Sequence, residues 1–397
     1  MRIIKTVMKK SALRGIAAGS VLLLTPMLSI FTAGIMPEAI HFMTEAARFS
    51  SYPLNDPREV NNGSLILYTP RSPEESTAEA EELEAPGEEP REATLLSRNI
   101  SQTNEDLSVY GDHSGVIREM TFTGSGGSDF INLPGGGQIR NCTELSNETV
   151  YGEATSMHGI RIELFSDEPQ VLILHTHTNE SYEPSEKTYY DESYTCRSED
   201  PGNSVVSVGT AIAEELASAG IAVLHDGTVH DGQYTGAYTR SYETTVRLLN
   251  EFPSIKIILD IHRDAIEEED GTHISAVTEI EGKKAAQIMI ISAADDGTYD
   301  IPNYLENLRF ASALQQSLEQ HYPTLARPIL FQYCQYNQQL SIGSLLIEVG
   351  SHGNSVDQAV YSGCLIGRSL AAMFTGDEIP VSSSRSVLPR FFIDKLR

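Results

Sequence analysis

Positively charged residues are scarce in this chain of 397 residues. The sequence holds 28 Lys and Arg against 55 Asp and Glu, which gives a formal net charge of −27 at pH 7. Nucleic-acid binding needs Lys and Arg to neutralise phosphates, so this balance argues against nucleic acid as a partner. It is typical of a well-solvated protein, and 40% apolar residues are enough to form the core of one or two domains.

Cysteine is also scarce, and the cysteines that are present lie far apart in the sequence. None of them forms a C-x-x-C pair with another: Cys142, Cys196, Cys334 and Cys364. This spacing argues against a disulfide framework, a cysteine zinc knuckle and a catalytic cysteine.

Near the N-terminus, residues Gly15 to Met36 form a run without charge, long enough to cross a bilayer at roughly 20 residues. Basic residues precede this run and predict that the N-terminus stays in the cytoplasm: Lys5, Lys9, Lys10 and Arg14. A cleaved signal peptide is the alternative. We favour an uncleaved membrane anchor over residues 1–36, because the run exceeds the usual length of a signal-peptide core. Either reading places the remaining chain outside the cytoplasm.

An acidic segment with almost no large apolar residue follows over residues 71–94, which contain nine glutamates. Such a segment cannot bury enough surface to offset the entropy of ordering. We therefore expect a disordered acidic linker over residues 37–118 that carries the folded part away from the membrane. A small region of strands and loops is expected over residues 119–165, and a C-terminal tail over residues 377–397.

Residues 166–376 alternate between predicted strands and predicted helices. Strands are expected at 171–175, from about 220, and at 255–261, 286–292, 329–333 and 344–349. Helices are expected at 204–219, 242–252, 303–322 and 356–374. This alternation is typical of an α/β fold with a mostly parallel sheet and helices on both faces.

Three of the apolar strands carry polar residues at their carboxyl ends. The three segments are VLILHTHTNESY (Val171–Tyr182), IKIILDIHRDA (Ile255–Ala265) and SLLIEVGSHGNS (Ser344–Ser355). Sites in open α/β sheets lie just beyond the carboxyl ends of strands. The three segments therefore predict a single metal-dependent active site.

A catalytic zinc ion usually takes three protein ligands from His, Asp and Glu and leaves one position for water. His177 and His262 are the candidate imidazole ligands. The carboxylate is either Glu180, which gives an H-x-x-E spacing, or Glu199, in the loop before the next helix. His175 is either a further ligand or a residue that orients one. A lone histidine at a strand end is more often simply hydrogen-bonded, but two of them with nearby carboxylates favour a metal site.

Glu348 lies inside a strongly apolar strand, where an unpaired carboxylate is costly to bury. Burial would raise its pKa, which suits a general base, whereas an exposed strand face is the alternative. Asp260 and Asp264 flank the histidine of the second segment and could orient its ring. Arg263 and Arg240 could bind a substrate carboxylate; for Arg240, a structural role at the start of a helix is an equally good interpretation.

The motifs HTHTNESY, NSVVSVG, GAYTRSYETT, PSIKIILDIHRDA and LLIEVGSHGNS resemble, in this order, those of the stage II sporulation protein P family. The resemblance covers roughly residues 165–375. It implies an amidase-like fold, because that family is related to the zinc-dependent N-acetylmuramoyl-L-alanine amidases. It also implies a zinc cofactor and a peptidoglycan substrate, cut between the glycan lactyl group and the stem peptide, with endopeptidase activity on cross-links.

The same resemblance implies a role in forespore engulfment with the sporulation proteins D and M as partners. It assigns His177 and His262 as zinc ligands and Glu348 as the catalytic glutamate. Related amidases place the third ligand at the start of the first helix, which favours Glu199. We prefer Glu180 because it belongs to the family motif. A non-catalytic scaffold that binds the cell wall and a generic extracytoplasmic zinc peptidase are the alternative functions.

Overall fold

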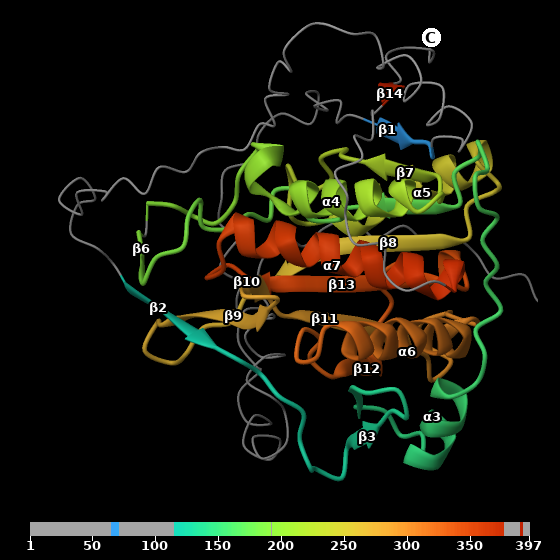
Figure 1. Cartoon of the computed structure of the whole chain (residues 1–397), viewed down its shortest axis with the longest axis horizontal. Helices are drawn as coiled ribbons and strands as arrows, with labels where there is room; N and C mark the ends of the chain where they lie inside the picture. The colour runs from blue at the N-terminus through green and yellow to red at the C-terminus, as the bar shows by residue number, and fades with distance from the viewer. Residues whose placement is uncertain (1–64, 71–114, 192, 377–389, 392–397) are drawn as a thin grey trace, which may run out of the picture.

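The computed structural model describes residues 65–70, 115–191, 193–376 and 390–391 (Figure 1). The expected anchor over residues 1–36 and the acidic residues 71–94 lie outside these ranges. No helix in the described part of the chain is long and apolar enough to cross a membrane.

A ten-stranded sheet forms the centre of the molecule, in the order β14-β1-β7-β5-β8-β13-β11-β12-β4-β3. The pairs β5–β7, β5–β8, β8–β13, β11–β12 and β4–β12 are parallel, and the pairs β11–β13, β1–β7, β1–β14 and β3–β4 are antiparallel. The strands are β1 (Leu65–Tyr68), β3 (Phe130–Asn132), β4 (Gln138–Asn141), β5 (Val171–Leu174), β7 (Val223–Asp226), β8 (Ile257–Asp264), β11 (Ile288–Ala294), β12 (Ile329–Tyr333), β13 (Ser344–Ser351) and β14 (Arg390–Phe391).

A second sheet of four strands lies beside the first, in the order β10-β9-β2-β6. Its strands are β2 (Gly115–Met120), β6 (Tyr189–Tyr190), β9 (His273–Ile280) and β10 (Lys283–Ala286). Strand β9 follows β8 in the chain, so this sheet begins close to the carboxyl end of a central strand.

Helices cover both faces of the large sheet, and Figure 1 shows α4, α7 and α6 lying across its front. Alternating residues of β5 explain the two layers. Val171 and Ile173 pack in the large core cluster with the apolar residues of α4, whereas Leu172 and Leu174 pack with Leu248 of α5. The helices are α3 (Asn147–Ala154), α4 (Val205–Ser218), α5 (Ala237–Glu251), α6 (Tyr304–His321) and α7 (Val356–Thr375), with short 3-10 turns η2 (Pro201–Asn203) and η3 (Gln338–Leu340).

The expected α/β class with helices on both faces is confirmed, and the sheet is largely parallel but contains antiparallel pairs as well. The antiparallel pairs lie at its edges and at β11, which runs antiparallel to β13. Hydrophobic patterning predicts that a strand exists but carries little information on its direction, because parallel and antiparallel strands both bury apolar side chains.

The linker expected over residues 37–118 contains a strand, because residues 65–68 form β1. Strand β1 pairs with β7, and Tyr68 is buried. Strand β2 also begins inside that range, at Gly115, and β14 pairs with β1 from within the expected tail. Local composition missed β1 because four apolar residues beside an acidic segment become a strand only through pairing with a distant edge.

Candidate active site

His177 lies just beyond β5, whose four apolar residues are all buried. The backbone turns here, since the Glu180 N–H donates to the His177 carbonyl over 3.0 Å. The His177 side chain is also buried, and within the described residues neither of its ring nitrogens has a hydrogen-bond partner. Burial lowers the pKa of His177 to about 4. The ring is therefore neutral at pH 7, which is the form that binds a metal ion.

His262 lies near the end of β8, and its ring centre is 5.4 Å from that of His177. Two carboxylates flank the His262 ring. Glu180 Oε2 lies 3.4 Å from Nδ1, and Asp260 Oδ1 lies 3.0 Å from Nε2. The Thr176 N–H and hydroxyl both donate to Asp260, over 2.8 and 2.7 Å, and so fix its carboxylate. The ring of His262 is thus held from both edges.

Charge in this cluster is balanced between His262 and its two carboxylates. Burial lowers the pKa of His262, but the charges of Asp260 and Glu180 outweigh burial and hold that pKa well above its usual value. Burial raises the pKa of Glu180, yet His262, His177 and Arg263 together hold it well below its usual value. The pair therefore carries a proton on the imidazole in the metal-free protein, and metal binding would displace that proton.

The side chains of His177, Glu180 and His262 fit a zinc ion. Two imidazoles and one carboxylate are a common donor set for catalytic zinc. With a Zn–N distance of about 2.1 Å, two imidazoles on one zinc ion place their ring centres roughly 5 Å apart, close to the 5.4 Å observed here. The buried His177 nitrogens that lack a partner in the described chain also favour a ligand at this position.

Glu348 lies on β13 directly opposite His262 of β8 in the parallel register. Its side chain is buried, and Oε2 has no hydrogen-bond partner among the described residues. Burial, followed by the charges of Asp264 and Glu180, raises the pKa of Glu348 to about 8, against the lowering effects of His262 and Arg327. A carboxylate with a pKa near the working pH is well suited to accept and return a proton.

The pKa of Glu348 predicts a pH dependence of stability in metal-free protein. Between the ordinary value of 4.5 and the folded value of about 8, the unfolded chain has lost this proton while the folded protein keeps it. The contribution of Glu348 to stability therefore falls as the pH rises through that range. Glu348→Gln removes this loss, so we expect it to be more stable than wild type at pH 8, with a smaller difference at pH 5.

Urea unfolding of both proteins in the presence of a chelator, at pH 5, 6.5 and 8, measures this difference. A stability difference that is constant with pH, or that grows towards acid pH, would contradict the raised pKa.

Two tyrosine rings pack against the His177 ring. The Tyr234 ring stacks on the His177 ring with centres 4.6 Å apart and planes 2° apart. The Arg197 guanidinium lies 5.2 Å from the Tyr234 ring centre and pairs with Asp231 over 2.7 Å. Tyr238, from the GAYTRSYETT motif, approaches His177 edge-on at 5.6 Å. Sequence reasoning missed Arg197, Asp231 and Tyr234, because they lie in loops without periodic pattern.

His175 does not lie with His177, Glu180 and His262 but contacts the backbone of the neighbouring strand β8. Its Nδ1 donates to the Ile261 carbonyl over 3.0 Å, and its Nε2 lies 2.9 Å from Nε2 of His225. Burial lowers the pKa of His175 to about 4 and that of His225 well below its usual value. Both rings are neutral, and His175 supports the residue that precedes His262. In this arrangement His175 helps to orient His262 through the backbone at Ile261.

Gly209 of α4 packs directly against this histidine pair. A Cβ atom at Gly209 would lie 2.7 Å from His225 Nε2 and 2.8 Å from His175 Cε1. Both rings are buried and hydrogen-bonded, so they cannot move aside. We expect Gly209→Ala to lower the free energy of unfolding by about 1–3 kcal/mol, although alanine favours helices. Urea unfolding measures the change.

Gly152→Ala in α3 is the matched control, because a Cβ there meets nothing within 4 Å. It should raise stability by roughly 0.5–1 kcal/mol through helix propensity. Similar effects of the two substitutions would show that the histidine pair does not constrain Gly209.

The other predicted residues lie in different surroundings. Glu199 is exposed in the loop before η2, whereas Glu180 is buried against His262. The Arg263 guanidinium donates to the carbonyls of Ser181 and Cys196, over 3.1 and 2.9 Å. These contacts give Arg263 a part in holding the loop after His177, and its binding of substrate stays a prediction.

Arg240 holds the loop ahead of α5. Its guanidinium donates to the carbonyls of His230, Gln233 and Thr235. These contacts match the structural interpretation of Arg240, a role at the start of a helix. Substrate binding by Arg240 stays a prediction.

A family model and a relative of known sequence point to the same protein family. The family model described as Stage II sporulation protein P matches residues 56–371. A relative of the same description from Bacillus subtilis (strain 168) is 28% identical over 204 residues. The matched stretch spans 48% of this chain and 48% of that relative, about half the length of each.

Two solved structures share features of the fold at low similarity. The N-acetylmuramoyl-L-alanine amidase AmiC2 of Nostoc punctiforme is 13% identical with a TM-score of 0.32, covering 52% of this chain and 96% of that chain. The CwlD amidase from Clostridioides difficile, solved in complex with the GerS lipoprotein, is 11% identical with a TM-score of 0.32, covering 52% and 100%.

Proposed function

Because the chain belongs to the stage II sporulation protein P family, we propose that it is a zinc-dependent peptidoglycan hydrolase of forespore engulfment. The proposed reaction is that of an N-acetylmuramoyl-L-alanine amidase, with endopeptidase activity on peptide cross-links as a second reaction. The observation that carries the proposal is the buried group of His177, Glu180 and His262 with Glu348 opposite His262.

The proposed mechanism divides the work among these residues. A zinc ion held by His177, Glu180 and His262 would act as a Lewis acid towards water and the amide carbonyl. Glu348 accepts the proton of the attacking water and returns it to the leaving amide nitrogen. Asp260 holds the His262 ring in place, as carboxylates beside metal-binding histidines do. The aromatic rings of Tyr234 and Tyr238 exclude bulk water around His177.

The proposed cellular setting follows from the N-terminal sequence and the family. Residues 1–36 would anchor the protein in the membrane with the catalytic part outside the cytoplasm. Peptidoglycan is the proposed substrate, and the sporulation proteins D and M are the proposed partners. Residues 71–94 would act as a spacer between the anchor and the catalytic part.

Digestion of purified sacculi by the zinc-loaded full chain tests the function. Mass spectrometry of the soluble products should find free stem peptides and glycan strands with intact lactyl groups. Cut cross-links without free stem peptides would identify a peptidase instead. No release, even with added zinc and the partner protein D, would favour the alternative of a non-catalytic scaffold that binds the cell wall.

A further inference from the structure

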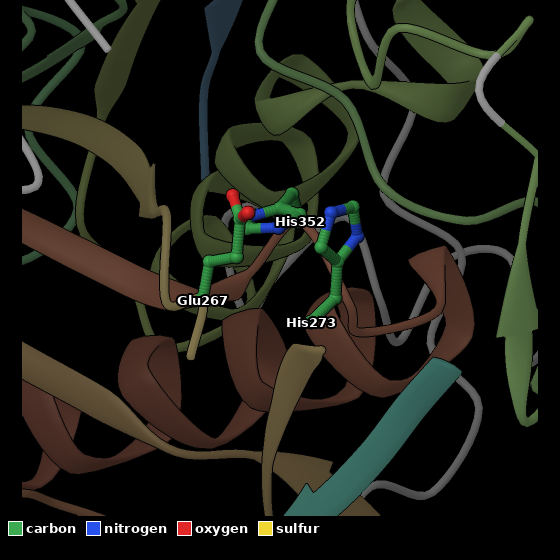
Figure 2. A group of neighbouring side chains, drawn as sticks. All are labelled: Glu267, His273 and His352. Carbon is green, nitrogen blue, oxygen red and sulfur yellow. The ribbon is translucent and has the colours of Figure 1, made fainter. Parts of the chain in front are cut away.

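A second group of metal-binding side chains lies outside the candidate active site. Glu267, His273 and His352 bring one carboxylate and two imidazoles together, and one ligand atom from each lies within 4.8 Å of the others (Figure 2). Glu267 comes from the connection between β8 and β9, His273 is the first residue of β9, and His352 follows β13. The sequence patterns gave none of these three residues a role.

Backbone pairing between the β8–β9 connection and the start of β9 places the first two side chains. Glu267 and His273 face each other across an isolated antiparallel bridge. The Ile274 N–H donates to the Ile266 carbonyl over 2.8 Å, and the Glu268 N–H donates to the Thr272 carbonyl over 2.9 Å. Residues directly opposite each other in an antiparallel pair lie on the same face. The carboxylate of Glu267 and the imidazole of His273 are therefore held on one side of this hairpin.

Main-chain contacts place His352 beside this hairpin. The His352 N–H donates to the Asp264 carbonyl over 3.1 Å, and the Ser351 hydroxyl donates to the Ile274 carbonyl. The neighbouring Gly353 packs so closely on the start of β9 that a Cβ there would lie 3.0 Å from the Ile274 carbonyl carbon. The main chain at His352 is therefore held by backbone packing against the start of β9.

The rings of the two histidines are packed edge against face. Their centres lie 3.9 Å apart with the planes at 80°, closer than the roughly 5 Å that two imidazoles on one zinc ion take, so metal binding would move the rings apart by about 1 Å. Tyr190 stacks on His273 at 3.6 Å, and its hydroxyl donates to the Gly271 carbonyl over 2.9 Å. Imidazole binds metal ions through its edge, whereas this stacking covers a ring face. The tyrosine can therefore restrain His273 without occupying its ligand atoms.

We propose that Glu267, His273 and His352 bind a second divalent transition-metal ion. Zinc fits two imidazoles and one carboxylate, whereas calcium and magnesium prefer oxygen ligands alone. The ion would tie the β8–β9 hairpin to the loop after β13. These segments follow His262 and Glu348 in the chain, so the ion would fix the relative positions of the two strand ends.

Zinc content of the full-length protein tests this second site. The protein is loaded with zinc and dialysed, and metal is then counted by mass spectrometry. We expect two zinc ions per chain in wild type, one in His352→Ala, one in His262→Ala and none in the double variant. Addition of a second equivalent of zinc should raise the melting temperature of wild type but not that of His352→Ala.

Glu267→Gln is the milder variant if His352→Ala fails to fold by circular dichroism, and it should also lose one zinc ion. His321→Ala is the matched control, because His321 is exposed in α6 and should leave two ions in place. If wild type binds a single zinc ion and only His352→Ala loses it, the result would support this site and contradict the active-site assignment. The proposal would be overturned if wild type bound a single zinc ion that His352→Ala retained, if His352→Ala retained two ions, or if wild type bound no zinc.

Discussion

Glu348→Gln is expected to slow the hydrolysis of peptidoglycan by roughly 10²–10⁴-fold, the usual contribution of a general base. The substitution keeps the size of the side chain but cannot accept a proton. Glu348 is not one of the three proposed zinc ligands, so zinc content should stay at the wild-type level. The rate of release of soluble muropeptides, with zinc measured on the same samples, gives both quantities.

Glu279→Gln is the matched control, because Glu279 is an exposed glutamate on β9. It should hydrolyse sacculi at the wild-type rate. If Glu348→Gln and Glu279→Gln release products equally fast, Glu348 is not the base, and the raised pKa reflects only burial in a structural position.

His177→Ala is expected to weaken zinc binding by more than about 100-fold and to remove hydrolysis. The reason is that changes to groups that merely orient ligands already cost 10–100-fold in metal affinity. Asp260→Asn supplies that milder case, since Asp260 contacts the His262 ring without being a proposed ligand. Competition with a zinc-binding dye gives the affinities.

Glu180→Gln and Glu199→Gln separate the two carboxylates that the sequence leaves open. Buried Glu180 lies against His262, so Glu180→Gln should resemble His177→Ala, while exposed Glu199 should tolerate the change. The reverse ranking would move the third ligand to the loop before η2. Circular dichroism on all variants excludes unfolding as the cause of metal loss.

The sequence predicted the parts of the site that lie on strand ends. Apolar strands that end in His177, His262 and Glu348 indicated one edge of a parallel sheet, and β5, β8 and β13 are parallel neighbours. The proximity of these residues could be inferred because consecutive parallel strands place their carboxyl ends together. The family could also be recognised, because its motifs occur in order along residues 165–375.

The sequence could not predict the parts that depend on loop conformation. The choice between Glu180 and Glu199 rests on which one the chain buries. The stacking of Tyr234 on His177 and of Arg197 on Tyr234 joins loops with no common pattern. Similarly, His175 and His177 are two residues apart, yet one faces the core and the other faces the cluster. Tertiary packing decides these outcomes, and local propensity does not encode it.

Anomalous diffraction at the zinc edge from crystals of the protein tests the central claim most directly. We expect a peak within bonding distance of His177, Glu180 and His262, with the carboxylate of Glu348 facing it. A well-ordered site with zinc in the crystallisation medium but no peak among these three side chains would contradict the account, even if zinc were bound elsewhere.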